Sequence, residues 1–226
     1  MNVPRRKPRT ARIGIFGVGY HVYWNQFPGL LDELMSKLAI LEQRVTATGV
    51  TVFNFGMVDK AQDAYALLPK LKAADLDLVF CDMLTYATSA SFGAIVRALD
   101  IPIVLVALQP LSAMDYPRAT THMQLANDDF CSVPEFLGVA IRMGKRPPEV
   151  ILGTLDNDPQ AEADLPAVAL VRDQLAVDVP GRGLAADHGA GAQHQRAEPH
   201  GRARPDREAV ARAGADADAV EADDLG

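Results

Sequence analysis

Apolar positions between residues 11 and 165 follow two alternating patterns, and each pattern predicts one kind of element. Short continuous apolar runs are typical of strands that are buried on both faces of a parallel sheet. Such runs lie at residues 11–17, 50–56, 77–82, 101–108 and 149–153. Apolar residues at three-to-four spacing predict amphipathic helices between the runs. These helices are expected at residues 27–46, 59–74, 89–99 and 134–143.

The regular alternation of strands and helices predicts the fold class. Strand–helix–strand units join parallel strands through right-handed crossovers, which place helices on the faces of the sheet. We therefore expect an α/β domain over residues 11–165, with a five-stranded parallel, doubly wound, flavodoxin-like sheet and helices on both faces. A basic arm at residues 1–10 precedes it. In such a sheet, ligands bind outside the carboxyl ends of the strands.

The composition changes after residue 165. Residues 166–226 consist mainly of Ala, Asp, Gly and Arg, and they contain no Phe, Tyr, Trp, Ile, Met or Lys. Without large side chains a segment cannot bury enough apolar area to offset its chain entropy. We expect a largely disordered C-terminal tail, with at most a frayed helix at 207–219. We favour a second explanation, in which a GC-rich gene translated in the wrong frame, with the break near Leu165, gives the same composition.

Bulk properties exclude several functional classes. The chain has 226 residues, 49% of them hydrophobic, and a formal net charge of −7. This charge argues against nucleic acid, because phosphate binding needs a basic face. No stretch approaches the roughly 20 apolar residues of a membrane span. Cys81 and Cys131 are far apart and lack zinc-ligand spacing, which favours a reduced, unbridged, cytoplasmic protein.

The loop at residues 17–29, GVGYHVYWNQFPG, follows the first predicted strand. Gly17 and Gly19 could open a dinucleotide-binding turn, but Val22 stands where the third glycine is required. Bulky side chains fill positions where a phosphate cradle has bare backbone: Tyr20, His21, Tyr23 and Trp24. Aromatic rings with nearby amides are typical of sugar-binding surfaces. The alternative is that Tyr23 and Trp24 only pack over the end of the sheet.

The next strand end offers Asp82, which could hold a hydroxyl or a cation, beside Cys81, which we expect to be a small buried hydrophobe. Thr88 or Ser89 is expected to cap the following helix. Ser89 lacks the GxSxG context of a nucleophile.

The long loop between the fourth strand and the next helix contains His122, Asp128 and Asp129. Long loops are often functional, and these residue types can ligate metals. Because the ordered part of the sequence has no second carboxylate–histidine set, we do not expect a complete metal site.

An ordered set of short motifs carries a resemblance to a known family. The motifs are Gly17–Tyr23 after the first strand, Thr85-Tyr86 after the third, Leu108-Gln109 after the fourth, then Asn127, Glu135-Phe136, residues 142–146 and residues 150–153. Together they resemble the N-terminal part of the L-arabinose isomerase family and its L-fucose isomerase-like relatives. The resemblance covers about residues 11–165.

The resemblance implies a metal-dependent aldose–ketose isomerase of carbohydrate metabolism. In that family a divalent cation, usually manganese, holds the sugar oxygens, and carboxylates move a proton between adjacent carbons. The metal-binding glutamates and histidines lie in later domains, beyond this length. The expected function is therefore an N-terminal fragment that is inactive alone, with no catalytic or metal residues of its own. A non-catalytic sugar-binding or regulatory α/β module is the alternative.

The resemblance also implies the substrate-binding residues. In the family this domain contributes a lip of the sugar site to a neighbouring subunit of a homo-oligomer. The residues that carry over are Tyr20, His21, Val22, Tyr23 and Tyr86. Tyr20 stands where arabinose isomerases more often have glutamine, which leaves the identity of the pentose or hexose open.

Overall fold

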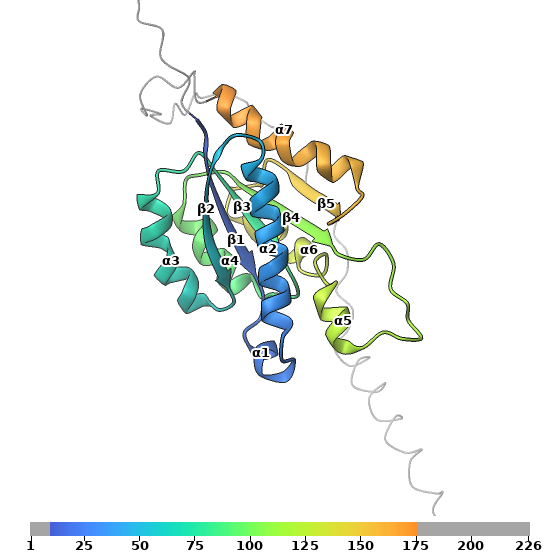
Figure 1. Ribbon diagram of the computed structural model, residues 1–226. Helices are drawn as coiled ribbons and strands as arrows, with labels where there is room; N and C mark the ends of the chain where they lie inside the picture. Colours follow the sequence, from blue (N-terminus) through green and yellow to red (C-terminus); the bar gives the residue numbers. More distant parts are fainter. Residues whose placement is uncertain (1–9, 176–226) are drawn as a thin grey trace, which may run out of the picture. The chain divides into compact units, whose positions relative to one another are not determined.

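Five parallel strands form one sheet in the order β2-β1-β3-β4-β5. Their bounds are β1 (Arg12–Val18), β2 (Thr51–Val58), β3 (Leu78–Met83), β4 (Ile103–Gln109) and β5 (Val150–Thr154). The computed structural model describes residues 10–175 (Figure 1), all within one compact unit. This strand order is that of flavodoxin-like sheets. The expected α/β class and five-stranded parallel sheet are confirmed.

Helices cover both faces of the sheet, as the alternating pattern predicts. One face packs against α2 (Leu30–Thr46), α5 (Thr121–Ala126) and α7 (Pro159–Leu175), and the other against α3 (Ala61–Ala73), α4 (Ser89–Ala98) and α6 (Val133–Arg142). The short α1 (Val22–Gln26) lies at one end of the sheet. Figure 1 shows α2 in front of the strands, with α3 and α4 behind them. The sheet is therefore doubly wound.

Each face has its own hydrophobic core. On the first face, α2 buries one apolar stripe against β1, β3 and β4: Leu30, Leu34, Leu38, Leu41 and Val45. Burying one such side chain stabilises the fold by about 1.5–3 kcal/mol. On the second face, the rings of Phe92 and Phe136 stack with centroids 4.6 Å apart. The two cores explain why the strands are apolar throughout.

Several element boundaries differ from the sequence-based predictions. The helix expected from residue 27 begins at Leu30, because Gly29 at its N-terminus has a left-handed φ of 85°. Both α1 and α5 lie in segments that we expected to be loops. The domain boundary expected at residue 165 falls inside α7. The remainder of the predicted tail, including the helix expected at 207–219, lies outside the described residues.

Within residues 10–175, none of the helices has the length and apolar character that a membrane span requires.

Candidate functional site

The connections after β1 and β3 flank the switch point of this sheet. From β1 the chain passes to β2 on one side, and from β3 it passes to β4 on the other. The two connections therefore diverge and leave a crevice outside the carboxyl ends of β1 and β3. Figure 1 shows α1 and α5 at this end of the molecule. We call this end the carboxyl edge.

Three tyrosines meet at the carboxyl edge. The Tyr20 ring lies 5.3 Å from that of Tyr23 and 5.8 Å from that of Tyr86, both in edge-to-face geometry. Tyr23 and Tyr86 lie 6.4 Å apart. All three are half-buried, and within residues 10–175 their phenol hydroxyls have no hydrogen-bond partner. The cluster therefore presents apolar ring surface together with free hydroxyl groups.

The other two predicted binding residues lie beside this tyrosine cluster. His21 is exposed, its ring contacts that of Tyr20 at 5.4 Å, and its Nδ1 is 3.3 Å from the carbonyl oxygen of Asp59. Val22 begins α1 and is 39% exposed. The structure thus brings Tyr20, Tyr23 and Tyr86 together and leaves Val22 at the margin.

The position of the Trp24 ring explains why residue 19, the second glycine of the GVG turn, has no side chain. A Cβ added at Gly19 would lie 2.9 Å from the Trp24 ring, so the bare backbone accommodates an indole. The indole Nε1 donates a hydrogen bond to Asp59 Oδ2 at 2.6 Å. Although residue 59 begins the segment predicted as a helix, Lys60 occupies the N-cap position of α3. Trp24 and Tyr23 also pack against the first core.

The acidic side chain of Asp128 interacts electrostatically with Tyr23 of the tyrosine cluster. Burial raises the pKa of the Tyr23 phenol, and the neighbouring Tyr86 and Asp128 raise it further. Burial likewise raises the pKa of Asp128. Partial burial of the thiol raises the pKa of Cys131 to about 12, which disfavours the thiolate at neutral pH although the residue as a whole is exposed.

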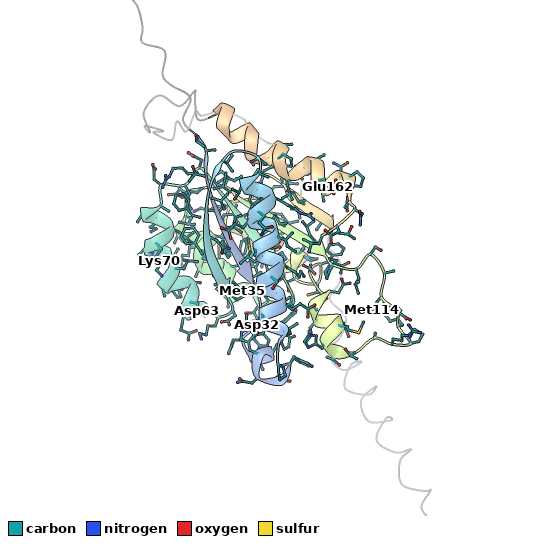
Figure 2. The ribbon with its side chains drawn as sticks, viewed as in Figure 1. Asp32, Met35, Asp63, Lys70, Met114 and Glu162 are labelled. Atoms are coloured by element: carbon teal, nitrogen blue, oxygen red, sulfur yellow. The ribbon has the colours of Figure 1, made fainter. Side chains whose placement is uncertain are left out.

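Asp128 also lines a cavity of about 510 Å³ beneath the long loop after β4. The other lining residues are Gln109, Leu111, Ser112, Ala113, Met114, Tyr116, Ala119, Gln124 and Asn127. Asn127 holds the loop, because its Oδ1 accepts from the Leu111 N–H at 2.8 Å and its carbonyl accepts from Gln109 Nε2 at 2.6 Å. Figure 2 shows Met114 on this loop, beyond the sheet.

A buried lysine, Lys37, connects several segments of the carboxyl edge through hydrogen bonds. Lys37 of α2 is 5% exposed, and its Nζ donates to Asp129 Oδ1 at 2.6 Å. It also donates to the carbonyl oxygens of Leu84 and Ala126, at 3.2 and 3.1 Å. Asp82, at the end of β3, is 4% exposed and interacts electrostatically with Lys37. Sequence reasoning singled out Asp82 but missed Lys37.

The residues weighed as metal ligands do not assemble. His122 Nε2 lies 3.0 Å from Glu33 Oε2 on α2, and Asp129 pairs with Lys37. Within residues 10–175 there is no group of three or more His, Cys, Asp or Glu side chains that could hold a metal ion. Cys81 is buried and Cys131 exposed, and both are free thiols.

The predicted cap of α4 is Thr88, which occupies the N-cap position without a side-chain hydrogen bond. The Ser89 N–H instead donates to Glu135 Oε1 at 3.0 Å.

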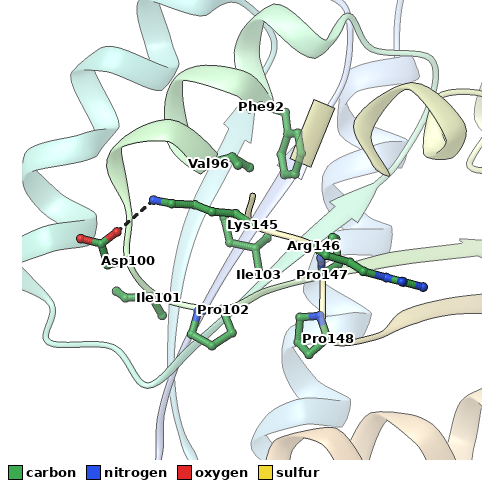
Figure 3. A pocket seen from close by; sticks show the side chains of 10 residues that line it. All are labelled: Phe92, Val96, Asp100, Ile101, Pro102, Ile103, Lys145, Arg146, Pro147 and Pro148. Carbon is green, nitrogen blue, oxygen red and sulfur yellow. Dashed lines mark hydrogen bonds and ion pairs between the residues drawn. The ribbon is translucent and has the colours of Figure 1, made fainter. Parts of the chain in front are cut away.

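A second cavity, of about 360 Å³, lies at the opposite end of β4 (Figure 3). Its wall includes Ile103, the first residue of β4, and Lys145, whose Nζ pairs with Asp100 Oδ1 at 3.0 Å. Proline and aliphatic side chains form most of the remainder. It lacks the tyrosines and the buried carboxyl groups of the carboxyl edge.

Comparisons with known proteins identify no family for this chain. No family model matches the chain, and no curated protein matches it. Among solved structures, it is similar to a type II dehydroquinase from Propionibacterium acnes, with 12% identity and a TM-score of 0.39. The match covers 71% of this chain and 99% of that one. A likeness at this level transfers no activity.

The expected relation to the L-arabinose isomerase family is wrong. No family model and no curated protein supports it. The expected function as a fragment of a manganese-dependent isomerase is therefore also wrong. The physical reason lies in the motifs: each marks a strand, the end of a strand or the end of a helix, and the α/β architecture itself requires such elements. Their order along the chain reflects the fold.

Proposed function

We propose that the carboxyl edge binds a small hydroxylated molecule, with monosaccharides as the ligand class that its side chains suit. One observation carries the proposal: Tyr20, Tyr23 and Tyr86 come from the two connections that flank the switch point and contact one another there. Ligands of open parallel sheets bind at this place.

The chemistry of the side chains supports this ligand class. Tyrosine rings can cover the C–H faces of a ligand, and their hydroxyl groups can donate to and accept from its hydroxyls. Asp128 stands beside Tyr23 and can accept hydrogen bonds from hydroxyl donors. The same carboxylate disfavours phosphates and other strongly anionic ligands.

The dimensions of the adjoining cavity agree with a small ligand. Its volume of about 510 Å³ falls within the range of roughly 300–1,000 Å³ that small-molecule sites occupy. Asp128 belongs both to the cavity wall and to the surroundings of Tyr23. A ligand can therefore contact the tyrosine cluster and extend toward the long loop.

The single tryptophan of the chain provides the test, because Trp24 lies beside the tyrosine cluster. Its fluorescence is followed while aldopentoses, aldohexoses, acyclic polyols or inorganic phosphate are added. We expect a saturable change with at least one hydroxylated compound and none with phosphate. Tyr86→Ala should weaken that binding by roughly tenfold or more, which corresponds to the loss of about 1.4 kcal/mol.

Tyr65→Ala is the matched control, since Tyr65 lies on α3 and is 64% exposed. This variant should bind as the wild type does. A lack of any saturable response to the hydroxylated compounds would contradict the proposal. Equal binding by Tyr86→Ala and the wild type would also contradict it.

A further inference from the structure

The Lys37 side chain is an ammonium group by its geometry. Its Nζ donates to three acceptors: Leu84 O, Ala126 O and Asp129 Oδ1. Three donated bonds require three N–H groups, which only the charged form has. Lys37 therefore contributes one positive charge to a buried location and links α2 to the end of β3 and to the segment after α5.

Two carboxyl groups surround this single positive charge. Asp129 is fully buried, and its Oδ2 has no hydrogen-bond partner. Asp82 is almost as deeply buried, and its charge acts on both Lys37 and Asp129. If both carboxyl groups were ionised, the cluster would carry a net negative charge away from water. Burial of an uncompensated charge is costly, and a buried group keeps its proton instead.

We propose that Asp82 and Asp129 share one proton beside the Lys37 ammonium at neutral pH, forming an acid–base site that retains this proton to higher pH when a ligand covers the carboxyl edge. The second half of this statement rests on the ligand site proposed above. The physical reason is that a bound ligand displaces water from the edge, and lower hydration disfavours the net negative charge that the cluster carries once the shared proton has left.

The raised pKa values of Asp82 and Asp129 are consistent with a cluster that holds one proton at neutral pH. Burial raises the pKa of Asp82 to about 7, against the lowering effect of Lys37. Burial raises that of Asp129 to about 8, again opposed by Lys37, and Asp82 adds to the rise. The two values belong to the pair, which loses its protons in coupled steps.

Other titratable groups also face the pair. Asp128 adds a half-buried carboxyl group whose pKa is raised by burial. Cys81, next to Asp82 on β3, and Cys131, before α6, have raised thiol pKa values because of burial. Both thiols stay neutral over the range in which the carboxyl pair titrates, so their charge does not change.

The first experiment uses the protein without ligand. Carbon-13 NMR of aspartate carboxyl groups, from about pH 4 to pH 9, should show a transition of the pair near neutrality, far above the ordinary range of aspartate. Asp82→Asn should remove this transition, and Asp115→Asn, at an exposed residue of the long loop, should leave it unchanged. Spectra in which both carboxyl groups are already ionised at about pH 5 would overturn the proposal.

The second experiment measures protons taken up on binding. Calorimetric titration at about pH 8.5, where the free protein has lost part of the shared proton, is carried out in buffers of different ionisation enthalpy with the compound that the fluorescence test identifies. We expect uptake of a fraction of one proton by the wild type and none by Asp82→Asn. Binding without proton uptake would overturn the coupling alone. Absence of binding would overturn the proposed function and with it the coupling. The NMR transition would then test separately whether Asp82 and Asp129 share a proton.

Discussion

Lys37 and Lys145 make the same set of contacts at opposite ends of the sheet. Each ammonium donates to two backbone carbonyls and to one aspartate: Lys37 to Leu84, Ala126 and Asp129, and Lys145 to Arg97, Leu99 and Asp100. Their surroundings differ. The side chains of Lys37 and Asp129 are 6% and 0% exposed, whereas those of Lys145 and Asp100 are 32% and 95% exposed (Figure 3).

The difference shows how burial changes the role of an ion pair. In water, the Lys145 pair is screened and adds little to stability. In the interior, Lys37 must balance two carboxyl groups, so the protonation of one group depends on the others. The same three kinds of contact therefore form a screened surface ion pair around Lys145 and a buried cluster of titrating groups around Lys37.

Replacing each lysine by methionine is the strongest way to break this comparison. Lys37→Met leaves Asp129 buried without its counterion and two carbonyls without a donor, which should cost about 3–5 kcal/mol. Lys145→Met should cost at most about 1 kcal/mol. Urea unfolding of both variants, measured at the same pH, gives the two values. Similar losses for the two variants would show that burial does not distinguish the pairs.

The pH dependence of stability should be the next largest effect. Burial raises the pKa of Asp82 from its ordinary value of 3.8 to about 7, and that of Asp129 to about 8. Between about pH 4 and pH 8 the native protein thus holds protons that the unfolded chain has released. Its free energy of unfolding must therefore fall as pH rises through this window, and it is highest at the acidic end.

Asp82→Asn isolates this contribution. With the second carboxyl group gone, Lys37 pairs with Asp129 alone, and the pH dependence over the same window should be flatter than in the wild type. Urea unfolding at pH intervals measures both slopes, and Asp115→Asn serves as the exposed control. Parallel curves for the wild type and Asp82→Asn would exclude Asp82 from the titrating cluster.

The sequence predicts the fold well because hydrophobic burial determines it. The five strands follow from apolar runs, and the stripe from Leu30 to Val45 on α2 is buried as expected. The structure of the turns cannot be predicted from hydrophobic burial in the same way. In its sequence, the turn that contains Gly19 resembles a nucleotide-binding loop. The contact between Gly19 and Trp24, however, depends on the three-dimensional path of the chain.

The candidate site could be predicted only in part. Tyr20, Tyr23 and Tyr86 follow strand ends, so their position is predictable, although their mutual contact is not. Lys37 has partners 47, 89 and 92 residues away, which no local pattern reveals. A signal was present all the same: residue 37 lies three positions after Leu34 and four before Leu41, on the buried side of α2. A lysine at an inward position requires a buried partner.

The resemblance to an isomerase family failed for a related reason. Motifs such as Thr85-Tyr86 and Leu108-Gln109 mark the ends of β3 and β4. Any chain with this topology needs a strand end and a turn at those places, so short matches in the same order report the architecture.

Two buried hydroxyl groups of the carboxyl edge give the smallest predicted effects, of opposite sign. Ser132 Oγ accepts from the Ala87 N–H at 2.9 Å and donates to the Ala87 carbonyl at 3.0 Å. Ser132→Ala leaves that peptide without partners and should cost about 1–2 kcal/mol. Thr85 Oγ1 is buried and has no partner, so Thr85→Val should be neutral or stabilise by up to about 1 kcal/mol.

Calorimetric melting of the two variants at about pH 6 measures both changes, and the difference in sign sharpens the contrast between buried and exposed polar groups. Polar atoms in the interior stabilise only when they are paired, whereas water satisfies unpaired atoms at the Lys145 end. A loss of more than about 1 kcal/mol in Thr85→Val would mean that its hydroxyl does have a partner in solution. An ordered water molecule at the carboxyl edge would be such a partner, and it would lie where a ligand hydroxyl is expected to bind.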